Sequence, residues 1–215
     1  MPNWSYNRNI FEGKTKDLEE FVEKINEYTK QNLAPNGFGK NWLGNICIGF
    51  GFNYNDIPCR GTCESIITDS IEHNEDNEDG FIEIDTMTAW ANNPEMWLAI
   101  IEKHKLNFKY HWYMEEEGMG DFYKTEGSDN YFPEKYYLHT SCDGNIETIY
   151  PETENDIIEH VNQTFGKTFE NIDEVKEFAD KLSDEDDDPE VFSENYIVLE
   201  PIVICDVNGN IPDTN

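Results

Sequence analysis

Residues 106–114, Leu-Asn-Phe-Lys-Tyr-His-Trp-Tyr-Met, place a large apolar side chain at every second position over nine residues. Successive side chains of a β-strand point to opposite faces of the sheet, so this period of two predicts a strand with one buried face. The glycine-containing segment 115–120 predicts a turn, and 121–125 predicts a strand that returns beside the first. The chain is therefore expected to contain an antiparallel sheet.

The same periodicity predicts helices and strands along the rest of the chain. Thr15, Thr153 and Asn171 are expected helix N-caps, and Pro94 is expected in the first turn of another helix. The predicted strands are 4–13, 46–54, 81–88, 106–114, 121–125, 136–140 and 196–204, and the predicted helices are 16–30 and those that follow Asn93, Thr153 and Asn171. The order strand, helix, strand, strand, helix, strand plus hairpin predicts an α+β fold, a ferredoxin-like sandwich with two helices on one sheet face.

The composition combines extreme acidity with enough apolar area for a core. The 215 residues include 46 Asp and Glu against 15 Lys and Arg, a formal net charge of −31, while 37% are hydrophobic and 13% aromatic. A disordered chain would have fewer apolar residues, so we expect a folded protein. The charge disfavours binding to nucleic acid or to an anionic membrane. A cation, a basic protein or water alone is the expected partner.

The domain organisation is predicted from where the composition changes. We expect residues 1–140 to form the ferredoxin-like core, and 141–215 to form an acidic C-terminal elaboration, a helical segment and a strand, packed on that core. No run approaches the roughly 18 apolar residues of a membrane span, and the first residues lack the pattern of a signal peptide. A cytoplasmic protein is expected. The five cysteines are odd in number and scattered, which favours reduced thiols.

Acidic residues gather in three runs that are candidate binding sites for a basic partner. An alternative remains open, because acidic runs are often solvated loops that keep a protein soluble. The candidate binding residues are Glu72, Glu75, Asp76, Glu78 and Asp79 in the first run, Glu115, Glu116 and Glu117 in the second, and Asp184, Glu185, Asp186, Asp187 and Asp188 in the third.

The motifs for metals and catalysis are incomplete. Cys59, Cys63 and His73 offer three zinc ligands where a structural zinc usually has four. The run that begins at Asp184 resembles the start of a calcium loop, and a second such start consists of Asp206, Asn208 and Asn210, but neither completes the ligand set. No nucleotide-binding, hydrolase or metalloprotease motif occurs. We therefore expect no cofactor and no enzymatic activity.

A family resemblance adds to this interpretation. Met1-Pro2-Asn3-Trp4, with Asn7 and Gly13 ahead of a helix, resembles the start of the YubB-type ferredoxin-like-domain proteins of plasmids, phages and integrated elements. Five further segments resemble the second half of that family: Thr88-Ala89-Trp90, Asn93-Pro94, 108–113, 115–118 and Gly120. The resemblance covers about residues 1–140. It implies the fold and a mobile-element origin, without implying an activity, and no cysteine spacing suits an iron–sulfur cluster.

Two hypotheses about function follow from these observations. The first is a non-enzymatic acidic interaction protein, an inhibitor from a mobile element whose carboxylates occupy a basic nucleic-acid-binding surface as a DNA mimic or anti-defence protein. It requires the acidic runs to share one surface. The alternative is a small-ligand-binding module, or an enzyme of unknown reaction, in which Tyr110, Trp112, Tyr113 and Tyr123 line a pocket. These aromatic residues would otherwise serve sheet packing.

Overall fold

The central strand of the protein is β1 (Trp4–Lys14), which pairs with a strand on each side. The computed structural model describes residues 3–34, 38–116, 118, 120–184 and 195–212. The chain forms two compact units, the first made of Met1–Tyr131 with Val203–Asn215 and the second of Phe132–Ile202. The sequence placed a boundary near residue 140 and assigned the whole C-terminal part to one region, whereas here the last strand returns to the first unit.

The first unit contains a six-stranded sheet in the order β2-β3-β1-β4-β5-β9. All its neighbouring strands are antiparallel except β5 and β9, which are parallel. Its other elements are α1 (Thr15–Tyr28), α2 (Leu43–Gly49), β2 (Gly61–Ile67), β3 (Asp79–Ala89), α3 (Pro94–His104), β4 (Lys109–Glu116), β5 (Asp121–Thr125) and β9 (Val203–Cys205). The predicted α+β class is confirmed, and the hairpin of β4 and β5 forms as expected.

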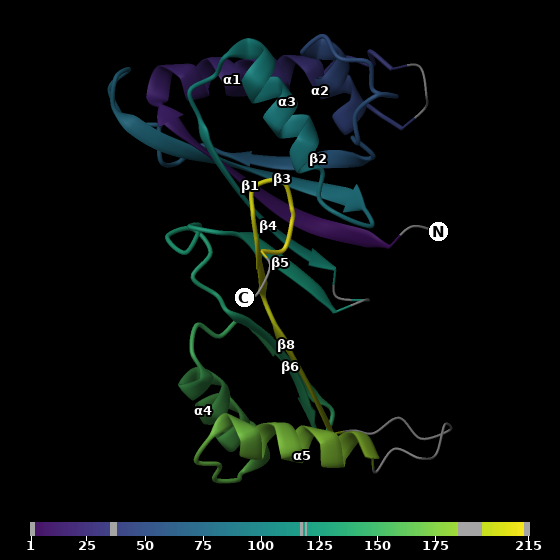
Figure 1. The fold of residues 1–215 in the computed structure, drawn as a ribbon, viewed down its shortest axis with the longest axis vertical. Helices are drawn as coiled ribbons and strands as arrows, with labels where there is room; N and C mark the ends of the chain where they lie inside the picture. The colour runs from purple at the N-terminus through teal and green to yellow at the C-terminus, as the bar shows by residue number, and fades with distance from the viewer. Residues whose placement is uncertain (1–2, 35–37, 117, 119, 185–194, 213–215) are drawn as a thin grey trace. The chain divides into compact units, whose positions relative to one another are not determined.

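Helices α1, α2 and α3 lie over one face of this sheet (Figure 1). Phe11 of β1 and Tyr110 of β4, which are partners in the strand register, both lie on that covered face. The Phe11 ring centroid is 5.2 Å from that of Phe21 on α1, 5.3 Å from Trp97 on α3 and 5.1 Å from Tyr110. Aromatic pairs at these distances contribute about 0.5–1.5 kcal/mol each beyond the area they bury. This cluster holds both helices on the sheet.

The segment predicted as a strand at 46–54 is instead helix α2 and the turn after it. Alternation of Ile46, Ile48 and Phe50 suits a strand, but Ile46, Cys47 and Phe50 are the buried residues, and positions i, i+1 and i+4 share one face of a helix. A Cβ at Gly49 would stand 2.2 Å from the Tyr28 ring. The glycine therefore allows α2 to approach α1 closely, and tertiary packing overrides the local alternation.

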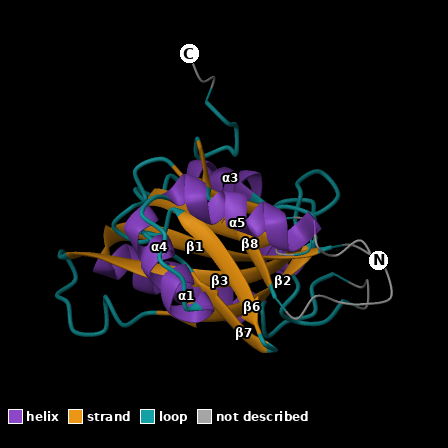
Figure 2. Cartoon of the chain, turned by 90° about the horizontal axis from the view of Figure 1, so that it is seen from below, coloured by secondary structure: helices purple, strands orange, loops and turns teal. Residues whose placement is uncertain are grey.

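The second unit contains a three-stranded antiparallel sheet in the order β7-β6-β8, with two helices that share a hydrophobic cluster with it. Figure 2 distinguishes its helices from its strands by colour. Both predicted caps form: Thr153 accepts from the Asp156 N–H, and Asn171 accepts from the Glu174 N–H at 3.0 Å. The elements are β6 (Tyr136–Cys142), β7 (Asn145–Ile149), α4 (Glu154–Phe165), α5 (Ile172–Asp184) and β8 (Tyr196–Pro201).

The strand predicted at 196–204 is divided between the two sheets. Strand β8 pairs with β6 in the second unit, and β9 pairs with β5 in the first. Pro201 has no N–H, which makes it a poor interior residue for a sheet, and the Ile202 N–H donates to the Lys135 carbonyl at 2.9 Å. Strands β2 and β7 lie where the sequence predicted no strand.

Candidate functional site

The most acidic exposed segment of the first unit is the loop between β2 and β3. Residues 68–78 contain five acids and neither Lys nor Arg. The loop is attached to the start of α1, because the Thr15 N–H donates to the Glu78 carbonyl at 2.9 Å and the Lys16 N–H donates to the Asp76 carbonyl at 3.2 Å. Ile71, 3% exposed, fixes the middle of the loop in the core. The acidic loop is therefore held against the start of α1.

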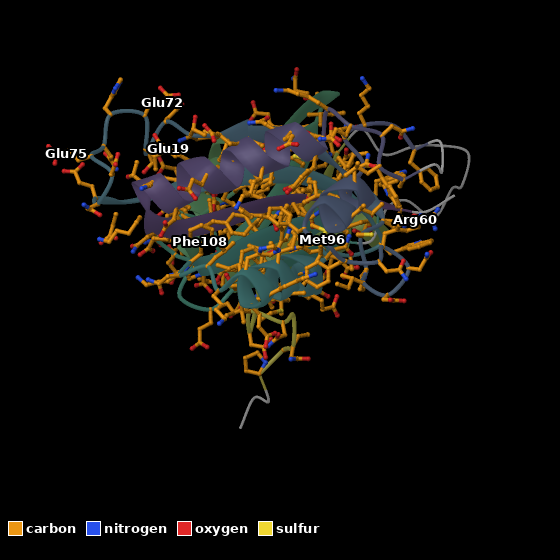
Figure 3. The ribbon with its side chains drawn as sticks, turned by 90° about the horizontal axis from the view of Figure 1, so that it is seen from above. Glu19, Arg60, Glu72, Glu75, Met96 and Phe108 are labelled. Atoms are coloured by element: carbon orange, nitrogen blue, oxygen red, sulfur yellow. The ribbon has the colours of Figure 1, made fainter. Side chains whose placement is uncertain are left out.

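Acidic residues of α1 continue this surface. A hollow of about 330 Å³ lies between α1 and the loop, and Glu19, Glu23 and Glu72 are among its lining residues. Figure 3 shows Glu19, Glu72 and Glu75 together at one end of the first unit, with Arg60 at the opposite end. We define the α1 acidic surface as the exposed residues Glu19, Glu23, Glu72, Glu75, Asp76 and Glu78.

Sequence reasoning named the loop acids of this surface but missed Glu19 and Glu23. They lie on the outer side of an amphipathic helix whose exposed residues include both Lys and Glu, so composition did not distinguish them. Thr15, the expected cap, is instead the first helical residue, and its hydroxyl donates to the Glu78 carbonyl at 3.2 Å. Asp79, also named from the sequence, begins β3 and forms an ion pair with Lys14 at 2.8 Å.

The second acidic run lies at the other end of the sheet. In the β1 register, Lys14 is opposite Asp79 and Tyr6 is opposite Glu115, a separation of eight residues along one strand, or roughly 26 Å. Glu116 is buried, and the Tyr113 hydroxyl donates to Glu115 at 3.2 Å. Glu117 lies outside the described residues. The structure therefore does not bring the first and second runs onto one surface.

The third acidic run belongs to the second unit. Asp184 is the last residue of α5, and Glu185, Asp186, Asp187 and Asp188 lie outside the described residues.

The aromatic residues proposed for a pocket separate into two groups. Trp112 and Tyr123 line a hollow of about 370 Å³ at the edge of the first unit. Tyr110 lies in the core beneath the helices and donates to the Asn9 side chain at 2.7 Å, while Tyr113 points to the other sheet face. We call this cavity the edge hollow; its lining residues are Trp90, Ala91, Asn92, Pro94, Glu95, Trp112, Met114, Asp121, Tyr123, Cys205, Asn208, Gly209 and Ile211.

The cysteines do not form the arrangement suggested by the sequence. Cys59 lies beside Cys47 of α2, and the hydrogen bond between their thiols lowers the pKa of Cys59 and raises that of Cys47. Burial raises the pKa of Cys63 to about 12, and His73 is exposed on the acidic loop. Within the described ranges, no three His, Cys, Asp or Glu side chains are grouped so that they could hold a metal ion.

A polar cluster on the sheet face opposite the three helices was not predicted. Arg8 donates to both carboxylate oxygens of Glu83, at 2.6 and 3.1 Å, and Ser65 donates to Asp85 at 2.5 Å. Burial, with the nearby charge of Asp85, raises the pKa of Tyr6. These residues come from β1, β2 and β3, so only strand pairing brings them together. The hydrogen bonds between Arg8 and Glu83 and between Ser65 and Asp85 indicate a structural role.

Comparison with protein families, with curated proteins and with solved structures finds no match to this chain. In the part of the chain that the structure describes, none of the helices is both long enough and apolar enough to cross a bilayer.

Proposed function

We propose that this protein is a non-enzymatic, cytoplasmic interaction protein whose α1 acidic surface binds a basic partner in competition with nucleic acid. The observation that carries the proposal is the attachment of the acidic loop to α1 by the backbone N–H groups of Thr15 and Lys16. Because these hydrogen bonds hold the loop acids beside Glu19 and Glu23, the carboxylates form one surface before any partner arrives. A preorganised surface pays less ordering entropy on binding than a flexible acidic tail.

Charge density supports a nucleic-acid-like surface, although α1 alone would not provide it. Duplex DNA carries one negative charge per roughly 1.7 Å of its axis, so a competitor needs closely spaced carboxylates. Lys16 and Lys24 are exposed on α1 and offset part of its acidity, whereas residues 68–78 contain no Lys or Arg. The loop is therefore the main source of negative potential, and a basic DNA-binding or RNA-binding groove is the partner that this surface suits.

The topology of the first unit supports assigning it to the ferredoxin-like class. Strands β2-β3-β1-β4 are adjacent in that order and antiparallel, α1 follows β1, and α3 connects β3 to β4. This is the arrangement that a split β-α-β unit repeated twice produces. Strands β5 and β9 extend the sheet. With the resemblance to YubB-type proteins, this assignment favours a mobile-element inhibitor acting against a host or defence protein.

The proposal is tested by replacing the loop acids without changing side-chain size. A variant with Glu72→Gln, Glu75→Gln, Asp76→Asn and Glu78→Gln should retain the fold, since amide oxygens can still accept the hydrogen bonds of the loop. A basic protein captured from host lysate by the unmodified chain should bind this variant about tenfold more weakly, through slower association, and the difference should shrink as salt rises.

A control variant removes four exposed acids from the second unit: Glu152→Gln, Glu159→Gln, Glu170→Gln and Asp180→Asn. Both variants change the net charge equally, so the control should bind almost as tightly as the unmodified chain. If both variants weaken binding equally, only the total charge matters. If the loop variant binds as tightly as the unmodified chain, the α1 acidic surface does not contact the partner.

A further inference from the structure

The edge hollow is a second feature of the first unit, and it lies outside the α1 acidic surface. Its walls come from the turn after β3, the start of α3, strands β4, β5 and β9, and the segment that follows β9. A volume of about 370 Å³ falls within the range of small-molecule sites. Three aromatic side chains, Trp90, Trp112 and Tyr123, contribute to the lining.

The C-terminal wall of the hollow is built by specific hydrogen bonds. The Trp112 indole N–H donates to the Val207 carbonyl at 3.1 Å. Asp206 accepts from the Asn210 side-chain amide at 2.9 Å and from the N–H groups of Asn208 and Asn210 at 2.8 and 2.9 Å. The bond from the Asn210 side chain, with those from the backbone, holds the pKa of Asp206 below its usual value. The Asp206–Asn210 segment is therefore a tight turn in which the carboxylate organises the backbone. The wall is preformed.

Trp90 is an unusual residue at the rim of the hollow. Its φ of 69° lies in the left-handed region that favours glycine, and its side chain is 57% exposed. The Arg60 guanidinium lies 4.7 Å from its ring centroid, although Arg60 does not line the hollow. An exposed ring buries little apolar area, and a left-handed backbone is unfavourable for a residue that has a side chain. Such an outlier points to a functional role.

The charge of the hollow selects against anions. Glu95 and Asp121 lie among the described lining residues, and none of those residues is Lys, Arg or His. The Tyr123 hydroxyl donates to one oxygen of Asp121 at 3.1 Å, which orients the carboxylate. An aromatic face attracts a cation through its quadrupole, and two nearby carboxylates add to that attraction.

We propose that the edge hollow binds an organic cation, with a methylated ammonium group against Trp90, Trp112 and Tyr123 and with Glu95 and Asp121 supplying the counter-charge. A methylated ammonium is larger and more weakly hydrated than an unmethylated one, so it loses less hydration free energy on leaving water, and it gains contact with the rings. Divalent metals such as Ca²⁺ and Mg²⁺ instead bind six or more oxygen ligands, and the two carboxylates of the hollow supply too few of these. The ligand is either a free small cation or a methylated lysine on a protein.

The first test compares choline with 3,3-dimethylbutan-1-ol, which has the same shape without the charge. Choline should bind the full-length protein at least about tenfold more tightly by calorimetry and should shift the indole N–H signals of Trp90 and Trp112 in NMR spectra. Equal binding of the two probes, or choline shifts confined to residues outside the hollow, would overturn the proposal. If a trimethyllysine peptide binds more tightly than choline, the ligand is a methylated lysine on a protein. If it binds more weakly, the ligand is a free small cation.

The second test uses variants that keep the fold. Trp90→Gly removes the ring and suits the left-handed backbone, so its melting temperature should stay within about 4 °C of the unmodified protein while choline binding falls several-fold. Glu95→Gln should also weaken the binding of choline. Its control is Glu102→Gln, which removes an exposed acid about 10 Å further along the same face of α3. Equal weakening by both glutamine variants, or no effect of Trp90→Gly, would contradict the site.

Discussion

At the residue scale, Glu12 on β1 shows how a partly exposed carboxylate can stabilise the sheet. Lys109 on the neighbouring strand β4 donates to one carboxylate oxygen at 2.6 Å, and the Tyr131 hydroxyl donates to the other at 2.9 Å. The hydrogen bond from Lys109, with that from Tyr131, lowers the pKa of Glu12 from its ordinary value of 4.5. Burial and the same contact raise the pKa of Tyr131 to about 12. The three side chains link β1 to β4 and to Tyr131 in the segment that follows β5.

We expect Glu12→Gln to destabilise the protein at neutral pH and to change how stability depends on pH. Because the folded pKa of Glu12 lies below the unfolded one, its stabilising effect is complete above pH 4.5 or so and is lost as the pH falls through the folded pKa. The difference in unfolding free energy between the variant and the unmodified protein should therefore narrow below about pH 4.5. Urea unfolding at several pH values measures this, with Glu19→Gln on exposed α1 as the control. A constant difference across the acidic range would show that Glu12 is not stabilised as a carboxylate.

At the element scale, the short helix α2 was predicted as a strand because its apolar residues alternate as well as recur at helical spacing. The glycine at its end is required by packing rather than by the backbone, since the Tyr28 ring occupies the space where a side chain would be. Helix α1 and the capped helices α4 and α5 were predicted correctly, because they are longer and repeat their apolar stripe over three turns or more.

We expect Gly49→Ala to destabilise the protein even though alanine favours helices. Helix propensity alone would stabilise the variant by about 1 kcal/mol, but overpacking a core costs about 1–3 kcal/mol, and the added Cβ would stand 2.2 Å from the base of the Tyr28 ring. The net loss in urea unfolding should be up to about 2 kcal/mol. Combining Gly49→Ala with Tyr28→Leu should recover part of it. A variant more stable than the unmodified protein would show that α2 can move away from α1.

At the scale of the whole molecule, self-repulsion is the main consequence of a net charge of −31. The ion pairs Lys14–Asp79 and Lys109–Glu12 each include a well-exposed side chain, so they offset little of this repulsion. The first and second acidic runs lie at opposite ends of the β1 register. Repulsion between acids in the first unit is therefore spread over that unit and is not confined to one point.

We expect added salt to stabilise this protein. Raising ionic strength from about 0.01 M to 0.15 M shortens the screening length from about 30 Å to about 8 Å, which weakens repulsion among acids on separate elements. The melting temperature measured by circular dichroism should rise over this range with sodium chloride. The loop variant and the second-unit control variant, each with four fewer acids, should show a smaller rise. A melting temperature that falls with salt would indicate that attractive ion pairs dominate.

The sequence by itself determined the α+β class, the β4–β5 hairpin, the capped helices and the exposure of the acidic loop. Each of these depends on neighbours in the chain: a period of two over 106–114, a cap three residues from its partner, or the absence of apolar residues from 72–79. Only the tertiary structure decided that α2 is a helix, that 196–204 divides between two sheets, and that Trp90, Trp112 and Tyr123 line one hollow. These features depend on contacts between segments far apart in the chain, where the space left by a partner, such as Tyr28 against Gly49, outweighs local preference.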